Sequence, residues 1–78
     1  MKWYKKAQYL IGEPVGIALK NGRGTSGILC SLGNTKIYLL EYNNDREFSL
    51  KQYHFEDIHN IHPFPPVQHL SFYSKLVH

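Results

Sequence analysis

Two turns rich in glycine and asparagine cut the segment from Val15 to Tyr42 into three short apolar runs. The first turn, Asn21-Gly22-Arg23-Gly24, supplies residues that tolerate positive φ where a hairpin reverses. The second, Gly33-Asn34-Thr35, has the residue types that favour a tight turn. Because no run is long enough for a helix of average length, the segment is predicted to form a three-stranded antiparallel meander.

Alternation of apolar residues predicts which faces of these strands are buried. Val15, Ile17 and Leu19 fall on one face of the first strand, because successive side chains in a strand point to opposite faces. Ile37 to Leu40 is a nearly unbroken β-favouring run in the third strand, which predicts burial on both faces.

The chain after Tyr42 continues this pattern. Phe48 to Tyr53 alternates again and is predicted to be a fourth strand. His54 to Asp57 suits a single 3₁₀ turn, and Ile58 to His62 forms a last short strand stopped by Pro63. The fold class is therefore mainly β, a small and strongly bent five-stranded barrel.

An amphipathic segment precedes the first strand. Trp3, Ala7, Leu10 and Ile11 have helical spacing, which predicts a short N-terminal helix that covers an open end of the sheet. Gly12 and Pro14 would end it.

Length and composition favour a single domain. Seventy-eight residues bury only a small core, which self-association would enlarge. Residues 1–64 form the predicted domain, and residues 65–78 form a proline-led tail. Val67, Leu70, Tyr73 and Leu76 recur every three residues there, so a short helix and a tail without regular structure both stay open.

Charge and cysteine usage bear on the compartment and the partner. The formal charge of +3 permits contact with a polyanion, but the nine basic residues are scattered, which is also typical of solvated faces. The lone Cys30 cannot form an intrachain disulfide, which favours a reduced, cytoplasmic setting. The apolar stretch before Gly12 is too short to span a membrane, so no membrane partner is expected.

The spacing of glycine and apolar residues resembles the first motif of the Sm-like (LSM/Hfq-like) superfamily. The matching positions are Val15-x-Ile17-x-Leu19-x-Asn21-Gly22, Gly27-x-Leu29, Asn34 and Ile37-x-Leu39, with Ile58-x-x-Ile61-x-Pro63 near the end of the domain. The resemblance covers about Trp3 to Phe64. It implies a strongly bent five-stranded sheet behind an N-terminal helix, and rings in which the fourth strand of one subunit pairs with the fifth of the next.

An open barrel also leaves edge strands with unpaired backbone groups, which a second chain can complete. A homo-oligomer is therefore expected, and its contact is assigned to the two strands that the resemblance implies. The candidate edge residues are Phe48, Leu50, Tyr53, Ile58 and Ile61.

The resemblance also implies an RNA site, from which this chain departs. Gly33 stands where uridine-binding members place a carboxylate, and Thr35 stands where they place an aromatic ring. His54-Phe55-Glu56 replaces the Tyr-Lys-His run of Hfq-type proteins. The candidate RNA-binding residues that remain are Asn34, His54, Phe55, Lys5, Lys6, Arg23 and Lys36.

Each of these candidates has a structural alternative that stays open. Asn34 is also an ordinary turn residue, and Phe55 could plug the end of the barrel instead of stacking a base. No catalytic or metal constellation stands out, since Glu56 and Asp57 are adjacent and His59 and His62 fall on opposite faces of a strand. We therefore expect no enzyme, cofactor, metal or small-molecule substrate.

Because the framework matches the family while the pocket residues do not, the sequence favours a non-catalytic Sm-like assembly module. Such a module self-associates through its edge strands and engages a protein partner. The alternative is a ring protein that binds single-stranded RNA.

Overall fold

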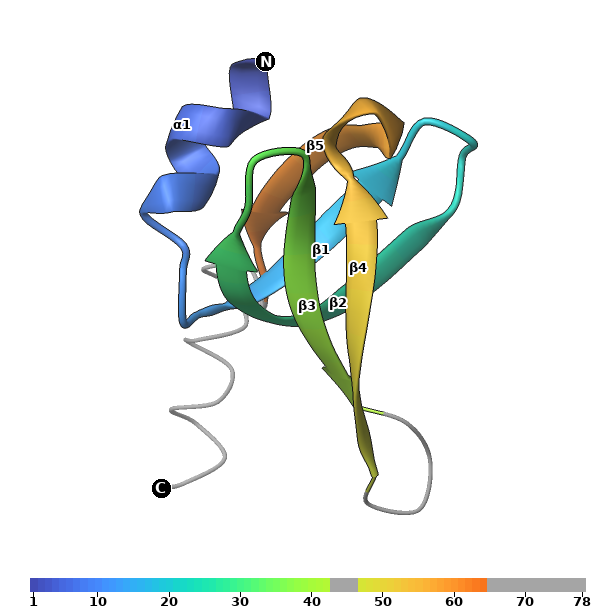
Figure 1. Ribbon diagram of the computed structural model, residues 1–78. Helices are drawn as coiled ribbons and strands as arrows, with labels where there is room; N and C mark the ends of the chain where they lie inside the picture. Colours follow the sequence, from blue (N-terminus) through green and yellow to red (C-terminus); the bar gives the residue numbers. More distant parts are fainter. Residues whose placement is uncertain (43–46, 65–78) are drawn as a thin grey trace, which may run out of the picture.

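The computed structural model describes residues 1–42 and 47–64, and it places a short helix before five strands of one antiparallel sheet (Figure 1). The elements are α1 (Lys2–Gln8), β1 (Pro14–Leu19), β2 (Gly24–Leu32), β3 (Lys36–Tyr42), β4 (Phe48–His54), the 3₁₀ turn η2 (Phe55–Asp57) and β5 (Ile58–Pro63). The predicted meander, fourth strand, 3₁₀ turn and last strand are confirmed. The predicted tail, residues 65–78, lies outside the described residues.

The strand order is β4-β3-β2-β1-β5, and every neighbouring pair is antiparallel. The mainly β fold with an N-terminal helix is therefore confirmed. Because β4 and β5 do not pair with each other, the sheet stays open and these two strands are its edges.

The sheet curves where β2 passes from β1 to β3 (Figure 1). Gly27 pairs with Val15, and a Cβ atom on Gly27 would lie 3.0 Å from the carbonyl carbon of Leu40 and closer still to its oxygen. The absence of a side chain thus lets the backbone of β3 approach. A register shift between Leu29 and Ser31 adds a bulge, which increases the local bend.

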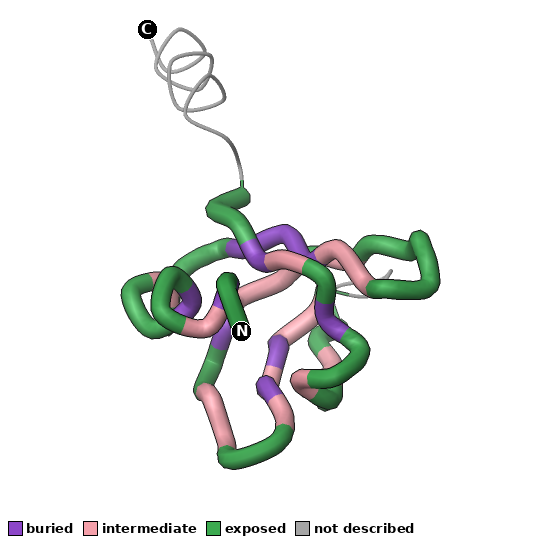
Figure 2. The backbone as a smooth tube through the Cα atoms, turned by 90° about the horizontal axis from the view of Figure 1, so that it is seen from above, coloured by how far each residue is buried: buried purple, intermediate pink, exposed green. Residues whose placement is uncertain are grey.

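One face of this sheet carries the core. In Figure 2, buried stretches alternate with exposed ones along the chain, as strands covered on one face require. The buried side chains are Trp3, Ala7, Val15, Ile17, Leu29, Ile37, Leu39, Ile58 and Ile61. The helix thus contributes Trp3 and Ala7 to the core, so the predicted use of its apolar stripe is confirmed for these two residues.

Two details of the prediction are wrong. The helix ends at Gln8, and the chain continues through turns in which Leu10 N–H donates to Ala7 O (2.9 Å) and Gly12 has a φ of 87°. Ile11 consequently lies outside the apolar stripe and is 47% exposed.

The second error concerns β3, for which burial on both faces was expected. Ile37 and Leu39 are buried, whereas Tyr38 and Leu40 on the opposite face are only half-buried. The reason is that the core forms only on the inner face of the sheet, and no described element packs over the outer face of β3.

Candidate interaction sites

A pocket of about 610 Å³ lies where the β2–β3 turn meets η2. Asn34 enters it from the turn, and His54 and Phe55 enter it from the end of β4 and the start of η2. The backbone N–H of Phe55 donates to Thr35 O at 2.8 Å and so joins the two segments. The structure therefore brings together three of the predicted RNA-binding residues.

Phe55 takes part in the core as well as in this pocket. Its ring packs edge-on against Trp3 with centroids 5.3 Å apart and against Tyr4 with centroids 5.6 Å apart. Phe55 is half-buried beside the hydrophobic core. The ring thus fills the space between α1 and η2, and its freedom to stack on a base is reduced.

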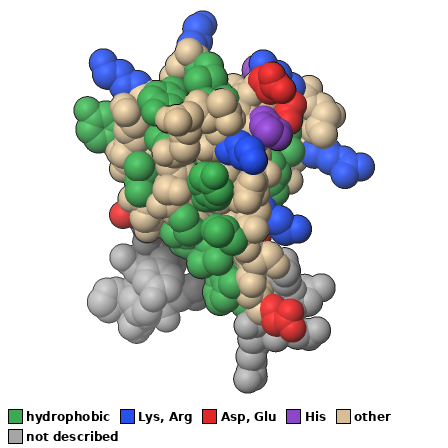
Figure 3. All heavy atoms as spheres, in the orientation of Figure 1, with side chains coloured by type: hydrophobic (Ala, Val, Ile, Leu, Met, Phe, Trp, Pro, Cys, Tyr) green, Lys and Arg blue, Asp and Glu red, His purple; other side chains and the backbone are tan. Residues whose placement is uncertain are grey.

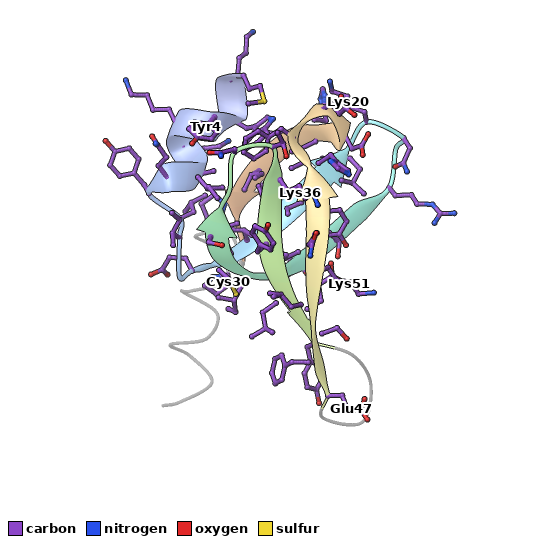
Figure 4. The ribbon with its side chains drawn as sticks, in the orientation of Figure 1. Tyr4, Lys20, Cys30, Lys36, Glu47 and Lys51 are labelled. Atoms are coloured by element: carbon purple, nitrogen blue, oxygen red, sulfur yellow. The ribbon has the colours of Figure 1, made fainter. Side chains whose placement is uncertain are left out.

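The basic candidates divide between several places. Lys5 lines a smaller hollow beside the pocket together with Asn34 and Phe55, and Lys36 is the strand partner of His54. The Nζ atom of Lys36 donates to Gln52 Oε1 at 3.1 Å on the face seen in Figure 4.

The other two basic candidates lie apart from the pocket. Lys6 Nζ donates to Asn60 Oδ1 at 3.1 Å, beside β5. Arg23 borders a separate groove with Gly16 and His62.

Sequence reasoning missed Lys20, a cation at the pocket (Figure 4). Its backbone N–H donates to Asp57 O at 2.9 Å, which ties the end of β1 to η2. This contact depends on the pairing of β1 with β5, which no local pattern reveals. Met1 and Lys20 line the pocket and were not predicted, Ile58 was predicted at the oligomer edge instead, and Thr35 and Glu56 were named only as departures from the family pattern.

A polar cluster involving Tyr53, the neighbour of His54 near the end of β4, lies on the inner face of the sheet. The hydroxyl of Tyr53 donates to Glu41 Oε2, and Thr25 also hydrogen-bonds to this hydroxyl. Burial, and then the hydrogen bond to Glu41, raise the pKa of Tyr53 above its usual value. The Tyr53 side chain therefore lies on the inner face of the sheet, and its prediction as a contact residue at the edge is wrong.

The backbone of β4 defines one edge of the sheet. The N–H of Phe55 bonds to Thr35, so the backbone of Phe55 faces β3. In an antiparallel ladder the residues of a strand face its neighbour alternately, and the register of β4 with β3 is regular. The backbone N–H and C=O groups of Leu50 and Gln52 therefore face away from β3, towards the free edge. The Leu50 side chain is 58% exposed. This edge thus combines outward-facing backbone groups with an apolar side chain.

The backbone of β5 defines the other edge and differs in its donors. Phe64 N–H donates to Pro14 O at 3.0 Å, so the backbone of Phe64 faces β1. By the same alternation, the backbone groups of Ile61 and Pro63 face away from β1, towards the free edge. Ile61 N–H already donates to Asn60 Oδ1 at 2.9 Å, and Pro63 has no N–H.

The two isoleucine side chains of β5 that were predicted to lie at this edge are not available there. Ile58 and Ile61, both candidate edge residues, are buried in the core. Helix α1 packs against β5, and Lys6 reaches Asn60 from it. An edge contact at β5 would therefore rely on its backbone groups and on exposed polar side chains such as His59 and His62, and not on the two isoleucines.

Apolar side chains also gather on the outer face of the sheet, over β3 and β4 (Figure 3). Leu40 pairs with Leu50, and Tyr42 pairs with Phe48 in an edge-on ring contact with centroids 5.0 Å apart. A groove of about 360 Å³ runs from these strands to Pro14 and Phe64. We call Ile28, Leu40, Tyr42, Phe48, Leu50 and Phe64 the outer apolar face.

Within residues 1–42 and 47–64, no three His, Cys, Asp or Glu side chains come together in a group that could hold a metal ion. Over the same part of the chain, no helix has the length and apolar character needed to cross a bilayer. Comparison of the chain with protein family models, with curated proteins and with solved structures returned no match.

Proposed function

We propose that this chain is a non-catalytic assembly module of Sm-like type, which self-associates through the edges of its sheet and engages a protein partner. The observation that carries the proposal is the edge formed by β4, where Leu50 and Gln52 turn backbone groups outward. Among the described residues, no other strand pairs with this side of β4. Such an edge is a template for strand addition by a second chain.

The Sm-like part of the proposal is supported by the order of the elements. A short helix precedes five antiparallel strands, the 3₁₀ turn lies between the last two, and the first and last strands are neighbours. The close approach at Gly27 gives β2 the bend that a small barrel needs.

The outer apolar face supports the protein partner. Phe48 and Leu50 are 59% and 58% exposed and lie side by side with other apolar residues, and clustered apolar groups on a surface mark interaction sites. A partner that covers this face would remove them from water.

The edge is tested by measuring the mass of the chain in solution. Proline at position 52 removes an outward N–H without touching the ladder to β3, so Gln52→Pro should keep the fold and shift the protein towards the monomer. Gln52→Thr is the matched control, because it loses the contact to Lys36 but keeps the N–H. Sedimentation equilibrium measures both, and a strict monomer for the unaltered chain at high concentration overturns the proposal.

A second function, binding of single-stranded RNA, is supported by the pocket that Asn34, His54 and Phe55 share. An amide reads base edges, and Lys5 and Lys20 border the site as phosphate contacts. Titration of labelled uridine-rich and adenine-rich oligomers at two salt concentrations tests it. An RNA-binding protein loses affinity steeply as salt rises, and Asn34→Ala should weaken its binding, whereas an assembly module shows no saturable binding.

A further inference from the structure

We propose that self-association is two-fold: β4 pairs antiparallel with β4 of a second copy, and the axis passes beside Leu50. This inference rests on the proposed assembly function and specifies its geometry. It differs from a head-to-tail contact between β4 and β5, because both copies offer the same strand.

The first argument is the supply of backbone donors at the two edges. On β4, both Leu50 and Gln52 turn an N–H outward. On β5, Ile61 N–H is bonded to Asn60 Oδ1 and Pro63 has no N–H to give. If a strand of another copy paired with β5, its carbonyl groups opposite Ile61 and Pro63 would find no free N–H donor. Such unpaired carbonyls cost free energy once they are removed from water.

The second argument is access. Helix α1 packs against β5, and Lys6 shares the oxygen of Asn60 that caps Ile61. A covering helix and a proline are devices that keep edge strands from pairing. The part of the chain described here holds no such cover along β4.

The third argument is self-complementarity, which a two-fold contact requires. Outward-facing residues of β4 must meet outward-facing residues of the other copy, so the axis passes beside one residue and not between two. Of the registers near the middle of the strand, a centre at Gln52 sets two polar side chains together and places the apolar Leu50 opposite His54 of the other copy, which leaves centres at Lys51 and Leu50. A centre at Lys51 sets two ammonium groups directly opposite each other, which is destabilising. A centre at Leu50 places the two Leu50 side chains together and sets Lys51 opposite Ser49 of the other strand.

This register also joins the outer apolar faces of the two copies into one continuous surface. Leu50 and Phe48 belong to that face and lie next to the axis, so the pairing covers part of their exposed area. Burial of this apolar area on pairing supplies a driving force in addition to the backbone hydrogen bonds.

Disulfide trapping distinguishes the registers and the modes. In a Cys30→Ser background, which removes the only native thiol, Leu50→Cys should form a covalent dimer under mild oxidation. Directly opposed residues lie about 5.5 Å apart at Cα, within the range of a disulfide. Lys51→Cys is the matched control, because diagonal neighbours at about 7–8 Å should not be trapped.

The mass of the unaltered chain separates this inference from the proposed function. A dimer by sedimentation, trapped at position 50 and not at 51, supports the two-fold contact. A larger ring without trapping at position 50 overturns it while leaving the assembly function intact, and preferential trapping at 51 overturns the register. A strict monomer overturns both.

Discussion

The hydroxyl of Tyr53 donates a hydrogen bond to the carboxylate of Glu41, and this contact fixes the inner side of β4 to its neighbours. Thr25 of β2 bonds to the same hydroxyl, so three strands meet at one polar point beside an apolar core. The edge strand that we assign to self-association is thereby held in place before any partner binds.

Replacement of Tyr53 by phenylalanine should change both stability and its pH dependence. Loss of the hydroxyl should lower the free energy of unfolding by about 1 kcal/mol near neutral pH. The raised pKa of Tyr53 means that the folded chain keeps a proton that the unfolded chain releases at about pH 10. The stabilising contribution is therefore complete below that pH and declines as the pH rises through the folded value.

Urea unfolding of both proteins from about pH 8 to pH 11 measures this difference. Tyr53→Phe should lose less stability than the unaltered chain over the alkaline part of the range. Parallel curves for the two proteins would contradict the role assigned to the hydroxyl.

Addition of a methyl group at Gly27 should be strongly unfavourable. The new Cβ would meet the backbone carbonyl of Leu40, which cannot move without disturbing the pairing of β2 and β3. We expect Gly27→Ala to cost about 1–3 kcal/mol by thermal or urea unfolding. Gly24→Ala is the control, because its Cβ lies 3.4 Å from Ile17 O, an ordinary contact, and its stability should be unchanged or slightly raised.

The contribution of α1 is tested at Trp3. This side chain is buried and contacts Phe55 edge-on, so Trp3→Ala should destabilise the fold by about 3–5 kcal/mol, a large share of the stability of a small domain. Tyr9→Ala is the control: Tyr9 directly follows α1, but its ring is 81% exposed, so its removal should change the free energy of unfolding by no more than about 0.5 kcal/mol. Equal losses in the two variants would contradict the docking of α1.

The features predicted correctly from sequence are those that neighbouring residues determine. The reversal at Gly22, with a φ of 89°, and the alternation of Phe48 and Leu50 are local, so the hairpins could be derived. Lys20 reaches the pocket only because β1 pairs with β5, which is a long-range contact. Ile11 was misassigned because the spacing of apolar residues continues past the residue at which the backbone leaves the helix.

The difference between the two edges could not be derived for the same reason. Lys6 and Asn60 are 54 residues apart, and nothing near either position indicates that they meet. The family resemblance implied that both β4 and β5 take part in the contact, whereas the hydrogen bond of Ile61 N–H and the proline at position 63 make β5 the poorer donor.

Removal of the Asn60 side chain should therefore make β5 competent for strand pairing. In Asn60→Ala, Ile61 N–H loses its acceptor and turns an unsatisfied donor towards the free edge, where the carbonyl of another strand can accept it. We expect species larger than those of the unaltered chain, seen by sedimentation velocity. Asn60→Asp is the matched control, because its carboxylate still accepts from Ile61 and still binds Lys6, so it should retain the original mass. If Asn60→Ala also keeps that mass, the Asn60 cap is not what holds β5 out of the assembly, and the covering helix and Pro63 must do so alone.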